Sequence, residues 1–186
     1  MSNLKREAAR VLDFWFGPPP RENRVVWFEK NDAFDRAIRE NFAPLHEQAA
    51  TGACDAMASN PKGSLALVIV LDQFSRNLFR DDPKAFACDD RALDHARRAI
   101  GRGFDRQLHV VERQFLYLPL EHCEDPKVQA ESVALFSTIG GDALDFAQRH
   151  QEIIERFGRF PHRNAVLGRD STAAELAFLQ EPGSSF

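Results

Sequence analysis

An unbroken apolar stretch, Ser64-Leu65-Ala66-Leu67-Val68-Ile69-Val70-Leu71, lies near the middle of this chain. A helix formed by this stretch would be apolar on every side, which predicts a helix surrounded by protein on all faces. Its β-branched residues could indicate a strand, but the helical pattern continues as far as Phe79. We therefore expect one central buried helix from about 61 to 79.

Apolar residues recur at helical spacing in most of the remaining chain, and capping residues mark where the segments begin. Short connections and the lack of a convincing strand predict an all-α fold of about eight helices, each antiparallel to its neighbours. Because no linker interrupts the pattern, we expect a single domain over residues 1–186. The other expected helices are 4–16, 32–50, one from Pro83 (capped by Asp82) to Gly101, 108–118, one from Pro126 (capped by Asp125), one from Asp142 to Phe157, and a last one with a Thr172/Glu175 capping box.

Composition narrows the class of protein. The apolar fraction is 44%, and 16 phenylalanines predict a Phe-rich core. The net charge of −4 argues against nucleic acid as a partner, since such proteins need a basic surface. No apolar run approaches the roughly 20 residues that cross a bilayer, and no secretory signal is present, so we expect no membrane partner. Three widely spaced cysteines indicate neither a disulfide framework nor a zinc ribbon, and favour a reducing cytoplasm.

A loop between two expected helices concentrates positive charge. Residues 156–169, RFGRFPHRNAVLGR, hold four arginines and His162, and are shaped by glycine and proline. Guanidinium groups match carboxylates or phosphates, so this arginine loop predicts an anion site. The alternative is that its arginines pair with acids on neighbouring helices. The candidate ligand-binding residues here are Arg156, Arg159, Arg163 and Asn164, with His150 on the preceding helix.

The second half of the central helix is strongly polar. A buried helix that becomes polar must meet water, a cavity or partner charges, because an unpaired buried charge is very unfavourable. One interpretation is that this stripe lines a pocket. The other is that Asp72 pairs with Arg76 and the rest is a solvated helix end. The candidate ligand-binding residues are Asp72, Gln73, Arg76, Asn77 and Arg80.

His122 and Glu124 form a polar corner, and together with His162 they are the candidate catalytic residues. With His150 or His162 they could in principle supply metal ligands, but the spacing matches no recognised zinc motif. We therefore expect no metal. No phosphate loop, nucleophile elbow or dinucleotide fingerprint is present, so we expect no cofactor.

Four motifs occur in order: VLDFWFG from Val11, LDQFSRNLFR from Leu71, FLYLPLEHCED from Phe115 and RFGRFPHRN from Arg156. Together they resemble the domain of unknown function 924 family over nearly the whole chain. The resemblance implies an all-helical, tetratricopeptide-like superhelix of helical hairpins, and it implies no reaction. The family's pattern falls here on Asp72, Gln73, Arg76, Asn77, His122, Glu124, Arg156, Arg159, Arg163 and Asn164. Cys123 stands where the family more usually has Ser, which weakens any role for a hydroxyl there.

These observations predict one polar pocket, lined by Arg, His and Glu, where three segments converge: the polar half of the central helix, the His122–Glu124 corner and the arginine loop. A small anionic ligand is its expected partner, and the protein could be an enzyme that moves a proton there. The alternative, by fold analogy only, is a helical module that holds a peptide or partner protein in a groove. A structural salt-bridge network is the third interpretation. The sequence predicts neither the ligand nor the oligomeric state.

Overall fold

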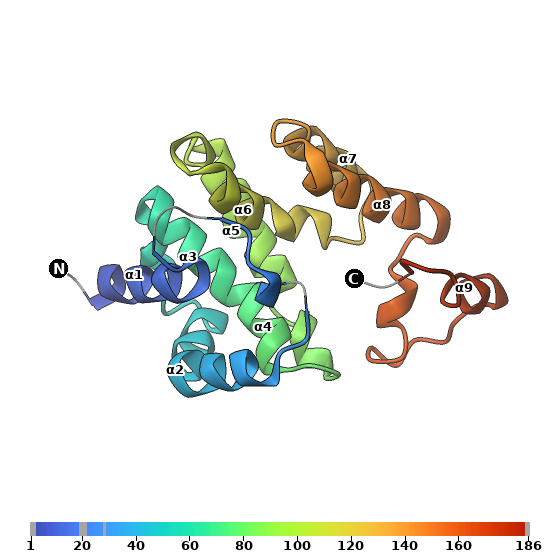
Figure 1. Ribbon diagram of the computed structural model, residues 1–186, viewed down its shortest axis with the longest axis horizontal. Coiled ribbons are helices and arrows are strands. Elements are labelled where there is room, and N and C mark those ends of the chain that lie inside the picture. The colour runs from blue at the N-terminus through green and yellow to red at the C-terminus, as the bar shows by residue number, and fades with distance from the viewer. Residues whose placement is uncertain (1–2, 19–21, 28, 185–186) are drawn as a thin grey trace. The chain divides into compact units, whose positions relative to one another are not determined.

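The computed structural model describes residues 3–18, 22–27 and 29–184. Within these ranges the chain is helical and contains no strand, which confirms the predicted all-α class (Figure 1). No described helix is both long enough and apolar enough to cross a membrane.

The α-helices are α1 Asn3–Phe16, α2 Asp32–Ala50, α3 Pro61–Leu71, α4 Gln73–Leu78, α5 Asp89–Gly101, α6 Val110–Glu121, α7 Pro126–Phe136, α8 Gly141–Phe157 and α9 Ala173–Phe178. The 3₁₀ helices are η1 Val25–Trp27, η2 Asp55–Ser59, η3 Pro83–Phe86, η4 Asp105–Gln107 and η5 Pro161–Arg163.

Helix α3 is the central buried helix that the apolar stretch predicts. Every residue from Leu65 to Leu71 is 0% exposed. The Asn60 side chain caps its start by accepting a hydrogen bond from the Gly63 amide at 3.0 Å. Helices α1, α2 and α5 pack against it, and the all-round apolar surface is covered in this way (Figure 1).

The largest differences from the predicted boundaries concern two helices. The expected single helix 61–79 is divided at Asp72 into α3 and α4. The expected helix from Pro83 is also wrong at its start, because Pro83–Phe86 is a 3₁₀ turn and α5 begins only at Asp89. At this 3₁₀ turn, Arg76 donates to the Ala85 carbonyl at 3.2 Å, which fastens the turn to α4.

The chain divides into two compact units, each with its own core. Unit 1 comprises Met1–Arg80 and Lys84–Pro119, and unit 2 comprises Asp81–Pro83 and Leu120–Phe186. Buried aromatic rings fill unit 1 and confirm its Phe-rich core: the Phe74 ring lies 5.8 Å from Trp15 and 5.0 Å from Phe42. The core of unit 2 consists of Ile153, Ile154, Phe160 and Phe178, with Phe157 packed against them.

In unit 2, helices α7 and α8 pack against each other. Asp125 caps α7 as predicted, accepting from the Lys127 amide at 2.7 Å. Helix α8 ends at Gly158, whose φ of 70° lies in the left-handed region that glycine adopts without strain. The chain then enters the arginine loop and reaches α9, whose predicted Thr172/Glu175 capping box is present.

Candidate functional site

The Arg76 guanidinium joins three segments of unit 1. Its Nη1 and Nη2 atoms bind the Asp89 carboxylate at 2.9 and 3.1 Å, and Nη1 lies 3.3 Å from Asp72 Oδ1. The Gln73 amide donates to the other Asp72 oxygen at 2.6 Å. Asp72 is 1% exposed, so these contacts compensate a carboxylate removed from water. This arrangement favours the interpretation in which Asp72 pairs with Arg76.

Asn77 and Arg80 converge on a different acid of unit 1. Asn77 Nδ2 donates to Asp35 Oδ1 at 2.7 Å, and Arg80 Nη2 donates to the same oxygen at 3.0 Å. Burial acts to raise the pKa of Asp35, but the hydrogen bonds from Arg80 and Asn77 and the charge of Arg80 outweigh it and lower that pKa. Gln73, Arg76, Asn77 and Arg80 are thus bonded to Asp72, Asp89 or Asp35, which are acids of their own unit.

In unit 2, Arg159 binds α9. Its Nε and Nη2 atoms grip the two oxygens of Glu175 at 2.7 and 2.9 Å, and Nη2 also donates to the Asp170 carbonyl at 2.8 Å. The hydrogen bond from Arg159, followed by the Thr172 backbone amide, lowers the pKa of Glu175 to about 2. Arg156 lies over the rings of Phe157 and Phe178 at 4.7 and 5.5 Å. Both arginines therefore fasten the last helix.

Glu124 holds the arginine loop through Arg169, a residue that the sequence reasoning did not select. Arg169 binds both Glu124 oxygens at 2.7 and 3.0 Å, and its Nε donates to Asn164 Oδ1 at 3.0 Å. The Phe160 amide also donates to Glu124 at 2.8 Å. Burial acts to raise the pKa of Glu124, but the hydrogen bonds from Arg169 and Phe160 and the nearby arginine charges lower it. Glu124 is therefore an ionised anchor of the loop.

The remaining candidates gather near the buried ring of Phe160, and we call this group the Phe160 corner: His122, His150, Phe160, His162 and Arg163. The Arg163 guanidinium carbon lies 4.5 Å from the Phe160 ring centre, and the rings of His150 and His162 lie 5.4 and 5.7 Å from it. The His122 and His150 ring centres are 6.3 Å apart. Arg163 Nη1 donates to the His122 carbonyl at 3.0 Å.

Two histidines of the corner are neutral at physiological pH. Burial lowers the pKa of His150 to about 3, and the charges of His122, Arg163 and His162 lower it further against an opposing hydrogen bond to Phe146. Burial and then Arg163 lower the pKa of His162 to about 4, although Glu124 acts in the opposite direction. Titratable groups with strongly shifted pKa values gather at functional sites more often than elsewhere.

The tautomer of His150 follows from its partners. Its Nδ1 lies 2.9 Å from the Phe146 carbonyl and 3.2 Å from Glu121 Oε1, and both of these atoms are acceptors. Nδ1 must therefore carry the proton, which leaves Nε2 with a lone pair. His150 and Glu121 are each 4% exposed.

The predicted site residues thus form separate groups within each unit. Asp72, Gln73, Arg76, Asn77 and Arg80 make the contacts above in unit 1, and the others make theirs in unit 2. Convergence of the central-helix stripe, the His122–Glu124 corner and the arginine loop on one pocket stays a prediction. Among the described residues, no group of three or more His, Cys, Asp or Glu side chains is arranged to hold a metal ion.

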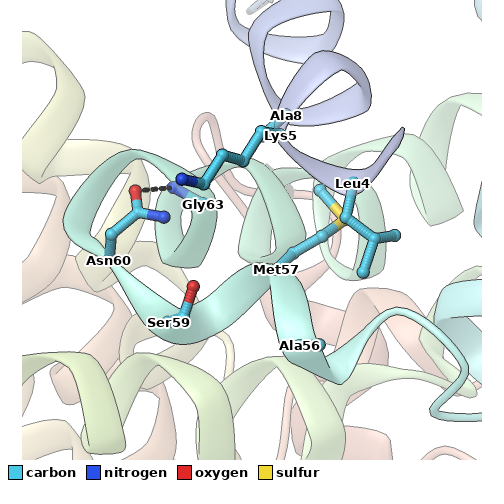
Figure 2. A pocket seen from close by; sticks show the side chains of 8 residues that line it. All are labelled: Leu4, Lys5, Ala8, Ala56, Met57, Ser59, Asn60 and Gly63. Atoms are coloured by element: carbon cyan, nitrogen blue, oxygen red, sulfur yellow. Dashed lines mark hydrogen bonds between the residues drawn. The ribbon is translucent and has the colours of Figure 1, made fainter. Parts of the chain in front are cut away.

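Unit 1 contains two cavities that the sequence reasoning did not anticipate. One, of about 230 Å³, lies between α1 and the start of α3 (Figure 2). Its lining is Leu4, Lys5, Ala8, Ala56, Met57, Ser59, Asn60 and Gly63. The other, of about 180 Å³, is lined by Asp55, Ala58, Ser64, His95, Arg98, Ala99 and Arg102. The basic residues of the second cavity share one face of α5, a spacing that the sequence alone could have revealed.

The fold and the Phe160 corner define an all-helical protein with a cationic, histidine-rich corner in its second unit. The chain belongs to the family described as "Bacterial protein of unknown function (DUF924)", whose model matches residues 11–183. A solved structure, a protein of unknown function ATU0120 from Agrobacterium tumefaciens, is 39% identical with a TM-score of 0.90. The match covers 96% of this chain and 99% of that one. A search of curated proteins gives no match.

Proposed function

We propose that this protein binds a small anion, a carboxylate or a phosphate, at the Phe160 corner of unit 2. Arg163 supplies the fixed positive charge, and His122 and His162 supply further polar contacts. The observation that supports this proposal is the gathering of one guanidinium and three imidazoles in a corner built on one buried ring. Arg163 is only 6% exposed, so its charge acts in surroundings where water screens it weakly.

The fixed charge of Arg163 favours an anion rather than a cation at the corner. The charge of Glu124 is matched by Arg169 at 2.7 Å, and Glu121 Oε1 lies 3.2 Å from Nδ1 of the neutral His150. Arg163 lowers the pKa values of both His150 and His162, which means that its positive charge is felt across the corner. An anion placed there would oppose that charge and stabilise the imidazolium forms.

The proposed site is smaller than the one expected from the sequence. The carboxylate contacts of Arg76, Arg80 and Arg159 favour a structural role for these three arginines. Among the predicted catalytic candidates, His122 and His162 are the groups suited to transfer a proton, because Glu124 is held by Arg169. The proposed activity is binding, with proton transfer to a bound acid as the chemistry available to the site.

The test is a titration of isotope-labelled protein with inorganic phosphate, and separately with citrate, at constant ionic strength. NMR signals of the imidazole rings and of the loop amides report binding at the corner. We expect saturable shifts at His122 and His162 in the wild type. Arg163→Gln should weaken binding about tenfold or more, since a hydrogen bond to a charged group contributes about 1.5–3 kcal/mol.

Arg149→Gln is the matched control, because Arg149 is an exposed arginine of the same unit on α8. It should bind both anions as the wild type does. Since Arg163 is buried, the Gln variant could unfold, so the wild-type imidazole shifts are an independent readout. Absence of imidazole shifts in the folded wild type with either anion would refute the proposed function.

A further inference from the structure

Helix α5 carries a second basic face, in unit 1. Arg91, His95, Arg98 and Arg102 are spaced by four, three and four residues, which places them in one row along the helix and its C-cap. The row faces η2 and the start of α3. Within this row, His95 is buried, at 5% exposed, whereas Arg98 is exposed.

Three residues of this row, His95, Arg98 and Arg102, line the cavity of about 180 Å³. The volume is large enough for a phosphate-sized ion together with bound water, since one water molecule occupies roughly 30 Å³. Its walls are the side chains of His95, Arg98 and Arg102 on one side, and Asp55, Ala58 and Ser64 on the other. All of these residues belong to unit 1.

The balance of charge in the cavity is positive. The Asp55 carboxylate is neutralised by Arg91 at 2.7 Å and also contacts His95 Nε2 at 3.2 Å. Arg98 pairs with Asp94 at 2.6 Å, but both side chains are more than half exposed, so this pair is weak and open to exchange. Arg102 donates to the carbonyl oxygens of Ala58 and Ser59 at 2.9 and 3.4 Å, and its guanidinium lies over the Phe104 ring. These partners carry no charge, and among the described residues none forms an ion pair with Arg102.

His95 contributes a second observation. Its Nε2 faces the Asp55 carboxylate and must therefore carry a proton. Its Nδ1 is buried and has no hydrogen-bond partner among the described residues. A buried polar atom without a partner is unfavourable and rare, and it calls for a water or a ligand. A hydrogen phosphate ion carries both acceptor oxygens for arginine and a hydroxyl that an imidazole lone pair can accept.

We propose that this cavity is a second anion site, independent of the Phe160 corner, that takes a phosphate-sized oxyanion. Arg98 and Arg102 bind its oxygens, Arg98 after exchanging Asp94 for the ligand, and His95 forms the inner wall. The site lies in unit 1 and the proposed function lies in unit 2, so each can fail without the other.

The experiment is the same titration with inorganic phosphate, now read from the amide signals of residues 55–64 and 95–102. We expect these signals to saturate with a dissociation constant of their own. Arg102→Gln should raise that constant about tenfold or more, for the reason given for Arg163. The constant fitted from the imidazole signals of unit 2 should not change.

Two further variants keep the test decisive. Ala58→Leu fills the cavity without altering charge, and it should also abolish the response in unit 1. Arg97→Gln, on the neighbouring exposed face of α5, should leave it unchanged. If phosphate gives no saturable response in the wild type, or if Arg102→Gln and Ala58→Leu both bind like Arg97→Gln, the proposal is wrong. The arginines would then only complement the dipole at the C-terminus of α5.

Discussion

Asp35 accepts hydrogen bonds from two residues that were predicted to bind a ligand. It is 7% exposed, and its contacts with Asn77 and Arg80 lower its pKa below the ordinary value of 3.8. A carboxylate with a depressed pKa stabilises the folded state above its unfolded pKa, and this stabilisation is lost as the pH falls through the folded value. The role of Arg80 can therefore be tested by stability alone.

We expect Arg80→Gln to lower the free energy of unfolding by about 1–3 kcal/mol at pH 7, because it removes charged hydrogen bonds to a buried carboxylate. The difference from the wild type should stay constant down to about pH 5. It should shrink below 3.8, where Asp35 takes up a proton. Urea unfolding at several pH values measures both quantities.

Arg36→Gln provides the control, because Arg36 lies on the exposed side of α2, the helix that carries Asp35. It should change stability by no more than about 0.5 kcal/mol. A loss for Arg80→Gln that is equally small, or that persists unchanged at pH 3, would contradict the structural role assigned to Arg80.

At the scale of elements, the contact between η2 and α3 depends on a glycine. A Cβ atom added to Gly63 would lie 1.9 Å from the Met57 carbonyl oxygen, a distance that backbone atoms cannot accommodate without moving. Asn60 caps α3 in the same turn, so the close approach fixes how the central helix begins. Alanine is otherwise the more favourable residue inside a helix, by about 0.5–1 kcal/mol.

Gly63→Ala should therefore destabilise the protein by about 1–3 kcal/mol, the usual range for overpacking a well-filled core. Thermal or urea unfolding of the purified variant provides the measurement.

Gly101→Ala is the matched comparison, because a Cβ atom added to this helical glycine would meet nothing within 4 Å. That variant should be neutral or slightly stabilising. Equal effects of the two substitutions would show that the approach of Met57 to Gly63 does not constrain the fold.

At the scale of the whole molecule, the open question is whether two compact units mean two domains. The unit boundary at Pro119 falls inside helix α6, which runs from Val110 to Glu121. Because one helix contributes to both units, we expect them to unfold together, as a single domain would.

The two tryptophans make this testable, since Trp15 and Trp27 both belong to unit 1. Tryptophan fluorescence then reports unit 1, whereas far-ultraviolet circular dichroism reports the helices of both units. We expect coincident transitions in urea. A second dichroism transition that the fluorescence does not follow would establish two domains. It would refute the prediction of a single domain over residues 1–186.

Local signals explain which parts of the fold were predictable. The apolar run at Leu65–Leu71, the Asp125-Pro126 start of α7 and the Thr172/Glu175 capping box each act within a few residues, and each is confirmed. The start of α5 was missed because the local signal, Asp82 followed by Pro83, is equally suited to the 3₁₀ turn Pro83–Phe86 that the structure contains. The contact between Arg76 and the Ala85 carbonyl at this turn comes from another helix, and sequence spacing does not predict it.

The sequence by itself determined the all-helical class, the central helix, most helix boundaries and the residues that carry charge. Only the tertiary structure decided which acid each arginine meets: Asp35 for Arg80, Glu175 for Arg159 and Glu124 for Arg169. The physical reason is range. Caps and periodicity act over one or two helical turns, whereas the pairing of a buried charge depends on which distant segment the packed core brings within about 3 Å.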